Sequence, residues 1–343
     1  MKRYITLLLL IALFPSCETA LDMGDDGLGD VLLMNAQMCT SETTHTVWLS
    51  LNSPDMISSV SGATVSCYVN DRLVSSTRTV EETDEQSLSP FLKGGFQASG
   101  YKIHASFNPG DQICIKADKG DLHCEAHVIV PKAPIILNAQ TNESRSRFSV
   151  RIQDIKEEYN YYSLSLISQG YVVVEETTPQ TGLAPGDTTI RENKVVKIET
   201  KGEPLLNSGA RTVSNPGSTQ ESFFDNTNNL FTDQLFRNGE YNIQFTNPKE
   251  RFDTRPRTWG GGGETYMVYN KAVIRILSHS IEEYVYLTGC EYARSVEGNN
   301  VLSEQFVFPS NVEGGLGYVS VSASTDYVIE FEPKRYDSGS FWP

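Results

Sequence analysis

Short stretches of alternating apolar and polar residues, separated by turn residues, dominate the sequence from Val31 to Val130. Alternation with a period of two places apolar side chains on one face of an extended strand, and Asn, Asp, Gly or Pro then ends the strand. About seven strands within roughly a hundred residues are typical of an immunoglobulin-like β-sandwich. The clearest expected strands are 46–51, 63–69, 101–107, 113–117 and 123–130.

A proline-containing segment, Val130–Pro131, ends this region. Proline cannot donate a hydrogen bond to a central strand ladder, so the strand pattern stops there. We therefore predict an N-terminal sandwich over residues 31–131 and a larger, antiparallel β domain over residues 132–343.

The second region also begins with strand patterns, at 147–152 and later at 272–277. Two apolar stretches, 161–166 and 171–174, flank Gln169–Gly170 and predict a hairpin that turns at this glycine. Ser280 and Glu283 have the spacing of a capping box, and apolar residues recur at helical spacing after them. The sequence thus predicts a mainly β fold with one helix near residues 280–294.

The N-terminus has the pattern of a secretory leader, with Lys2 and Arg3 before an apolar run from Ile5 to Phe14. This run is too short to span a bilayer. We predict that residues 1–16 form a signal peptide and that Cys17 carries the acyl chains, such as palmitate, of a lipoprotein. Residues 17–30, rich in Asp and Gly, would form a solvated acidic tether. A charged tether after a lipidated cysteine also resembles the export tag of Bacteroidetes cell-surface lipoproteins. This resemblance implies a cell-surface location at the outer membrane.

The charge balance is strongly acidic. The formal net charge of −15 becomes −17 when the leader and its two cations are removed. A surface of this sign repels phosphate backbones, so we expect no nucleic-acid binding.

Two cysteines flank a turn signal at Asp118–Lys119–Gly120. If this turn closes a three-residue loop, with Ala117 opposite Asp121, then Cys114 and Cys124 face each other and can form a disulfide. The alternative is a pair of free thiols that pack as small apolar groups.

No catalytic, cofactor or metal motif stands out. His123 and His127 flank Cys124–Glu125–Ala126, but the surrounding pattern is that of a strand. Histidines four residues apart on a strand are separated by about 13 Å, at roughly 3.3 Å per residue, so this pair cannot share a metal ion. Glu283 is explained by helix capping. We therefore predict neither a metal site nor a cofactor.

Two motifs near the C-terminus are more specific: the helix sequence at 276–287 and the turn Phe308–Tyr318, which includes Asn311 and three glycines. This pairing resembles a Bacteroidetes lipoprotein family catalogued as domain of unknown function 4249. The resemblance extends from Cys17 to about Phe331. It implies association with TonB-dependent outer-membrane transporters, and it supplies no catalytic residues.

Candidate binding residues lie in glycine-rich loops. Trp259 precedes a run of four glycines, where a large ring could contact a ligand or partner, or could pack beneath neighbouring loops. The turn glycines could likewise contact a ligand or simply supply positive φ angles. The candidates are Trp259, Asn311, Gly314, Gly315 and Gly317.

These features favour a non-catalytic, lipid-anchored outer-membrane protein that acts as an accessory or binding partner of a TonB-dependent nutrient transporter. Its ligand would be a small molecule or a glycan. The first alternative is a cell-surface adhesin or structural lipoprotein. A surface hydrolase is the third candidate.

Overall fold

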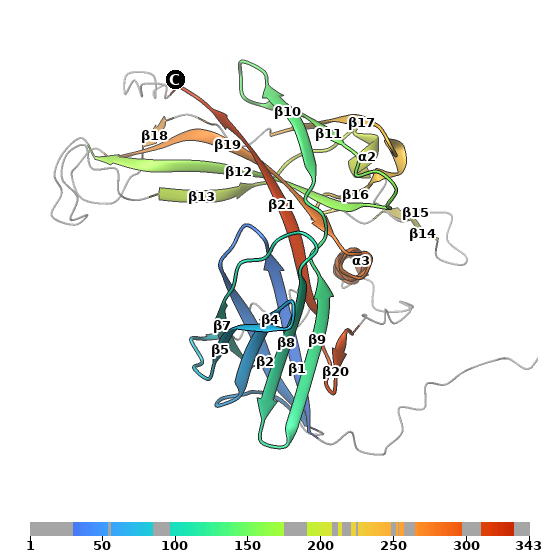
Figure 1. Cartoon of the computed structure of the whole chain (residues 1–343). Coiled ribbons are helices and arrows are strands. Elements are labelled where there is room, and N and C mark those ends of the chain that lie inside the picture. The colour runs from blue at the N-terminus through green and yellow to red at the C-terminus, as the bar shows by residue number, and fades with distance from the viewer. Residues whose placement is uncertain are drawn as a thin grey trace, which may run out of the picture.

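The computed structural model is mainly β, which confirms the predicted fold class, and consists of two lobes joined at a waist (Figure 1). Cys17 and Trp259 lie outside the residues that the structure describes. The described residues are 30–53, 56–84, 97–174, 191–207, 212–214, 221–223, 226–247, 252, 254–256, 265–296 and 310–332.

The first lobe contains two sheets that enclose one apolar core. The alternation of apolar and polar residues explains this core, because the inward residues of each strand are apolar. In β8, for example, Ile113, Ile115 and Ala117 are buried. One sheet contains β1 (Val31–Cys39), β2 (Thr44–Ser53), β3 (Met56–Ser59), β6 (Glu82–Asp84) and β7 (Ala98–His104). The other has the order β20-β9-β8-β4-β5, formed by β20 (Val312–Glu313), β9 (Leu122–Ile129), β8 (Gln112–Lys119), β4 (Thr64–Val69) and β5 (Arg72–Thr77).

The C-terminal part of the chain completes the first lobe. Strand β21 (Val319–Glu330) pairs in parallel with β1, so that Ala36 lies opposite Val319, and β20 pairs with β9. Val312, Val319 and Val321 belong to the same buried core as Leu32. That the chain divides at residue 131 into two units that fold separately stays a prediction. The core of the first lobe, however, contains residues from beyond this boundary.

The second lobe has its own apolar core. Strand β21 leaves the first lobe and continues into the second beside β19, so one sheet, ordered β13-β12-β19-β21-β1-β2-β7-β6, passes through both lobes (Figure 1). Its second-lobe strands are β12 (Tyr161–Val174), β13 (Arg191–Val196), β16 (Leu230–Thr232), β18 (Thr254–Pro256) and β19 (Thr265–His279). The remaining elements are β10 (Ile135–Thr141), β11 (Arg147–Gln153), β17 (Glu240–Thr246), β14 (Thr212–Ser214), β15 (Glu221–Phe223), α2 (Pro204–Asn207) and η1 (Asp233–Leu235).

The predicted hairpin at Gln169–Gly170 is wrong. Strand β12 continues through these residues for 14 positions, and its pairing with β19 shifts register between them, which is a β-bulge. A Cβ atom on Gly170 would lie 2.7 Å from the carbonyl oxygen of Val268. The glycine therefore permits the close approach of β19 rather than a chain reversal.

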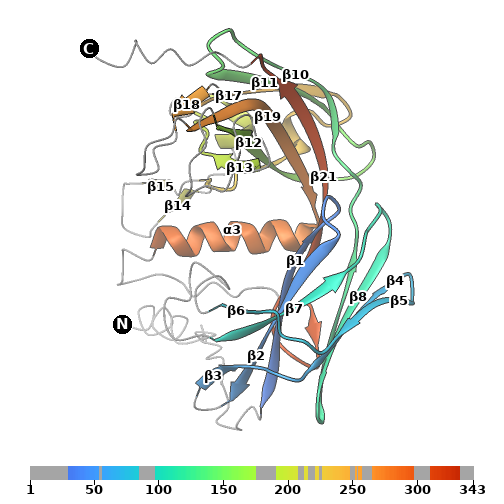
Figure 2. The same cartoon turned by 90° about the vertical axis from the view of Figure 1, so that its left-hand side faces the viewer.

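The predicted helix is present as α3 (Ile281–Val296) and lies at the waist between the lobes (Figure 2). Aromatic contacts hold it there: Tyr284 lies 5.0 Å from Tyr161 of β12, and Tyr286 stacks on Tyr318 at 4.5 Å, both between ring centroids. Within the described part of the chain, no helix is long and apolar enough to cross a membrane.

Candidate functional site

A cavity of about 1160 Å³ lies at the waist. Its walls come from both lobes, because the ends of β1 and β21 meet β12, β13, β19 and α3 there. Pockets of this kind, where elements from different parts of a fold converge, are the usual place for a ligand. The lining residues include Gln37, Met38, Glu42, Ser163, Ser165, Lys197, Leu206, Asn226, Thr227, Asn228, Asn229, His279, Glu283, Leu287 and Ser322.

A line of three buried polar side chains forms part of the wall. Ser163 Oγ lies 2.8 Å from His279 Nε2, and His279 Nδ1 lies 3.0 Å from Glu283 Oε2. The latter two atoms are close but lack hydrogen-bond alignment. Ser163, His279 and Glu283 are 9%, 5% and 4% exposed. Buried polar groups are costly unless they are paired, so this arrangement restricts how the three side chains can be oriented.

The strand register brings these residues together. In the pairing of β12 with β19, Tyr161 lies opposite His279 and Ser163 opposite Leu277, so Ser163 and His279 are diagonal neighbours on one face. Ser280 then caps α3, since the Glu283 N–H donates to Ser280 Oγ at 3.2 Å. The carboxylate of Glu283, which we predicted to complete the capping box, instead accepts a 3.0 Å hydrogen bond from Ser320 Oγ of β21.

The loop from Asn226 to Asn229 forms another wall and is fixed by its own side chains. The Asn226 amide donates to the carbonyl oxygens of Leu206 and Leu230, each at 2.7 Å. Glu291 of α3 accepts a 2.7 Å hydrogen bond from the Asn228 N–H. Because these bonds tie the loop to α2, β16 and α3, the cavity wall is preorganised.

The lining favours polar, uncharged or cationic ligands. Its charged groups among the described residues are Glu42, Glu283 and Lys197, and amide and hydroxyl groups surround them. The imidazole of His279 is among the described lining groups and is engaged with Ser163 and Glu283. The amide, hydroxyl and carboxylate groups of this lining can pair with the amide or amine groups of a ligand.

The same three residues resemble an activated nucleophile, because a histidine between a serine and a carboxylate is the order of a hydrolytic triad. However, Ser163 lies within a strand that is paired on both sides, opposite Leu230 and Leu277. The next main-chain N–H, of Leu164, donates to the Asn229 carbonyl at 3.3 Å. Main-chain donors beside the serine are therefore engaged in the sheet and cannot stabilise an oxyanion.

The predicted binding turn lies in the first lobe, and its residues Asn311 to Gly317 are not among the described residues that line the waist cavity. Asn311 donates to the Val319 carbonyl at 2.7 Å and accepts from the Val319 N–H at 2.9 Å, which closes the turn. A Cβ on Gly314 would lie 2.7 Å from the His123 oxygen, and one on Gly315 would lie 2.7 Å from the Leu32 oxygen. Gly317 has φ +119° and an even closer neighbour, the Met34 oxygen at 2.2 Å. These contacts give each residue a packing role, and ligand contact there stays a prediction.

The proposed disulfide between Cys114 and Cys124 is wrong, since both thiols are free. The hairpin turns at Gly120–Asp121, so Cys114 lies opposite His127 and Cys124 opposite Ala117. Cys124 points into the core and Cys114 out of it. The two cysteines are therefore on opposite faces of the sheet.

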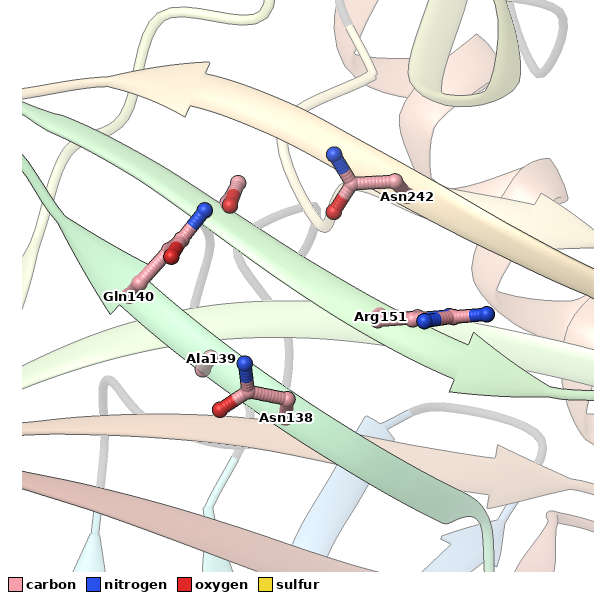
Figure 3. A pocket seen from close by; sticks show the side chains of 6 residues that line it. Asn138, Ala139, Gln140, Arg151 and Asn242 are labelled. Carbon is pink, nitrogen blue, oxygen red and sulfur yellow. The ribbon is translucent and has the colours of Figure 1, made fainter.

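A second, smaller depression of about 320 Å³ lies on the three-stranded sheet (Figure 3). Side chains from β10, β11 and β17 surround it, including Asn138, Gln140, Asn242 and Arg151. Arg151 forms an ion pair with Glu240, so its charge is already compensated. This surface lacks the buried polar groups that distinguish the waist cavity.

Comparisons with known proteins identify the family but no function. No functionally curated protein matches the chain. Among solved structures, a DUF4785 family protein from Legionella pneumophila is similar at 9% identity and a TM-score of 0.20, which is too low to support a functional argument. The match covers 72% of this chain and 50% of that one, so this chain spans about half the length of that protein. A family profile described as a domain of unknown function (DUF4249) matches residues 18–327, and the protein therefore belongs to this family.

Proposed function

We propose that this protein is a lipid-anchored outer-membrane protein that binds a small polar ligand in the waist cavity and acts as a non-catalytic partner of a TonB-dependent nutrient transporter at the cell surface. The leader and Cys17 support the anchor. The family resemblance supports the transporter association.

The waist cavity is the observation on which the binding function rests. A hollow of about 1160 Å³ whose wall includes the buried Ser163, His279 and Glu283 offers fixed donors and acceptors to a ligand. Such groups recover hydrogen bonds when a polar ligand enters, and their rigid mounting lowers the entropic cost of binding. The ligand class that fits best is a short peptide or another molecule with amide or amine groups.

Two tryptophan substitutions on α3 test the cavity. Leu287 lines it, whereas Val285 is exposed on the same helix. Short peptides, amines and oligosaccharides are screened by the rise in melting temperature that a bound ligand causes. We expect peptides or amines to stabilise the wild type, Leu287→Trp to abolish the effect, and Val285→Trp to retain it. Stabilisation by every ligand in both variants would place binding elsewhere.

The anchor and the partner are tested separately. Cys17→Ala should abolish acyl labelling and release the protein from the membrane fraction. Purification of the native protein from outer membranes should then recover a TonB-dependent transporter with the wild type. Membrane retention of the alanine variant without an acyl label would contradict the anchor, and recovery of no transporter would contradict the partner.

A second candidate function, surface hydrolase, is favoured by the 2.8 Å contact between Ser163 Oγ and His279 Nε2. An activity-based fluorophosphonate probe labels serines activated in this way. We expect no labelling of Ser163, because the main-chain donors beside it are engaged in the sheet. Labelling that disappears in Ser163→Ala would instead establish the hydrolase.

A further inference from the structure

The outward face of the five-stranded sheet in the first lobe gathers side chains that bind metals. Cys114 on β8 lies directly opposite His127 on β9, and Lys116 lies opposite Glu125. Side chains two residues apart on a strand point to the same face, so Glu125 and His127 are neighbours as well. A thiol, an imidazole and a carboxylate therefore meet on one face.

Two of the three distances among these groups are close to those of a metal site, and the third is bounded at 4.8 Å. Cys114 Sγ lies 3.8 Å from His127 Nε2, and His127 Nε2 lies 3.4 Å from Glu125 Oε1. One ligand atom from each residue lies within 4.8 Å of the other two. Ligands of a tetrahedral zinc ion are separated by roughly 3.6 Å for sulfur and nitrogen and roughly 3.4 Å for nitrogen and oxygen, given the usual bond lengths.

We propose that Cys114, Glu125 and His127 bind a divalent cation of the zinc type and leave a fourth coordination position for water or a ligand. A thiolate, an imidazole and a carboxylate are the ligand types that zinc takes, whereas a thiolate disfavours magnesium and calcium. Binding exchanges the thiol proton of Cys114 for the metal ion.

Neighbouring side chains would hold the carboxylate in place. Lys116 Nζ lies 2.5 Å from Glu125 Oε2, which leaves Oε1, the oxygen nearer to His127, available to the metal. His123 Nε2 lies 3.6 Å from the same Oε2, and its Nδ1 is 2.7 Å from Asp118. Such contacts around the ligands orient them and commonly strengthen metal binding.

The local charge also favours a cation. Glu313 of β20 lies opposite Glu125, and both Glu313 and Asp71 act electrostatically on Cys114. Lys116 is the cation that opposes them among the groups described at this cluster. The negative charges of the carboxylates at this cluster therefore outnumber the positive charge of Lys116.

The separation of His123 and His127 along the strand keeps these two imidazoles from sharing a metal ion, but it does not exclude a site that includes a residue of another strand. The structure places both imidazoles against Glu125 rather than against each other. The third ligand comes from the adjacent strand, and its position depends on the hairpin register. A turn at Gly120–Asp121 places Cys114 opposite His127, and this pairing could not be read from the spacing of residues 123–127.

Cobalt is the probe for this site, because thiolate-bound Co²⁺ has a charge-transfer absorbance. The full chain, purified reduced and stripped with a chelator, is titrated with Co²⁺ alone, and the cobalt is then displaced with Zn²⁺. We expect one Co²⁺ with a thiolate band. Cys114→Ser should remove the band, and His127→Ala and Glu125→Gln should each weaken binding by about tenfold or more.

Two variants serve as matched controls. Cys39→Ser removes a half-buried thiol elsewhere in the chain, and His104→Ala removes an exposed histidine of the same lobe; both should retain the wild-type titration. Far-ultraviolet circular dichroism should show that each variant is folded, because the ligands lie on the outward face of the sheet. Absence of the thiolate band in the wild type, its persistence in Cys114→Ser, or its equal loss in Cys39→Ser would each overturn the site.

Discussion

Glu283 Oε2 lies 3.0 Å from Nδ1 of His279, which precedes it by four residues, and the other carboxylate oxygen accepts a hydrogen bond from Ser320. One buried carboxylate thus joins the start of α3 to the end of β19 and to β21. Since β21 is the strand shared by both lobes, this contact stabilises the waist on which the cavity depends.

Removing this carboxylate should destabilise the fold. Glu283→Ala leaves the Ser320 hydroxyl and the His279 ring without their partner in a buried setting, and we expect the free energy of unfolding to fall by about 2–4 kcal/mol. Glu282, its exposed neighbour in the same helical turn, is the control, and Glu282→Ala should cost less than about 1 kcal/mol. Urea unfolding measures both. Equal losses would mean that helix propensity, and not the buried contact, determines the effect.

The turn that closes the first lobe should tolerate no side chain at Gly317. A Cβ there would meet the Met34 oxygen at 2.2 Å, in addition to the strain of φ +119°. Gly317→Ala should therefore lower the free energy of unfolding by about 3 kcal/mol or more. Gly110 has φ +89° but open space around its Cβ position, so Gly110→Ala isolates the backbone strain and should cost about 1 kcal/mol. Thermal unfolding of both variants separates the clash from the strain, and a similar loss in each would rule the clash out.

Acid should destabilise the first lobe through His45. Burial holds the pKa of His45 below its ordinary value of 6.5, against the opposing effects of the Ala105 carbonyl and Glu42. The unfolded chain then binds a proton more readily than the folded one. This contribution to stability is therefore fully present above pH 6.5 and is lost as the pH falls below it toward the folded-state pKa.

The variant His45→Gln tests this dependence. Its free energy of unfolding should fall less steeply below pH 6.5 than that of the wild type, because the titrating group is gone. His104→Gln, at an exposed site of the same lobe that forms a 3.0 Å hydrogen bond with Thr44, is the control for a histidine substitution as such. A wild-type slope in His45→Gln would assign the acid sensitivity to carboxylates instead.

The sequence predicted the fold class and the helix because periodicity and capping are local signals. Gln169–Gly170 was misassigned because a glycine that permits a bulge and one that permits a turn look alike without the partner strand. The Cys114–Cys124 pairing failed because it assumed a three-residue turn over Asp118–Lys119–Gly120, whereas the turn has two residues, Gly120–Asp121, and Lys119 lies opposite Leu122.

The candidate site was beyond sequence reasoning for a different reason. Ser163 and His279 are 116 residues apart and meet only through the pairing of β12 with β19. The spacing of Glu283 from Ser280 was explained by a capping box, so nothing in the sequence indicated its contacts with His279 and Ser320. A single chain contains no signal for strand pairing at such separation, so sites assembled from distant strands require the structure.

The stability of the first lobe should depend on residues 310–324, which come long after its strand β9 (Leu122–Ile129) in the sequence. The Met34 N–H donates to the Leu316 carbonyl at 2.8 Å, and the Ala36 N–H donates to the Tyr318 carbonyl at 3.0 Å. Without residues 310–324, β1 would become an edge strand with unpaired N–H groups, and part of the core would be exposed. We therefore expect residues 30–131 alone to be poorly soluble, or to unfold at a lower urea concentration than the same fragment extended by residues 310–324 through a Gly/Ser linker.

A scrambled version of the 310–324 segment on the same linker is the control, because it adds the same composition without the Asn311 turn or the glycines that fit against β1 and β9. The scrambled segment should give no stabilisation. The native segment should raise the urea midpoint, and the slope of the transition should increase only in proportion to the surface that the added residues bury. If residues 30–131 alone unfold cooperatively at the same midpoint as the extended fragment, the boundary at Val130–Pro131 is a true folding boundary. The pairing of β21 with β1 would then be a contact between two independently folded domains.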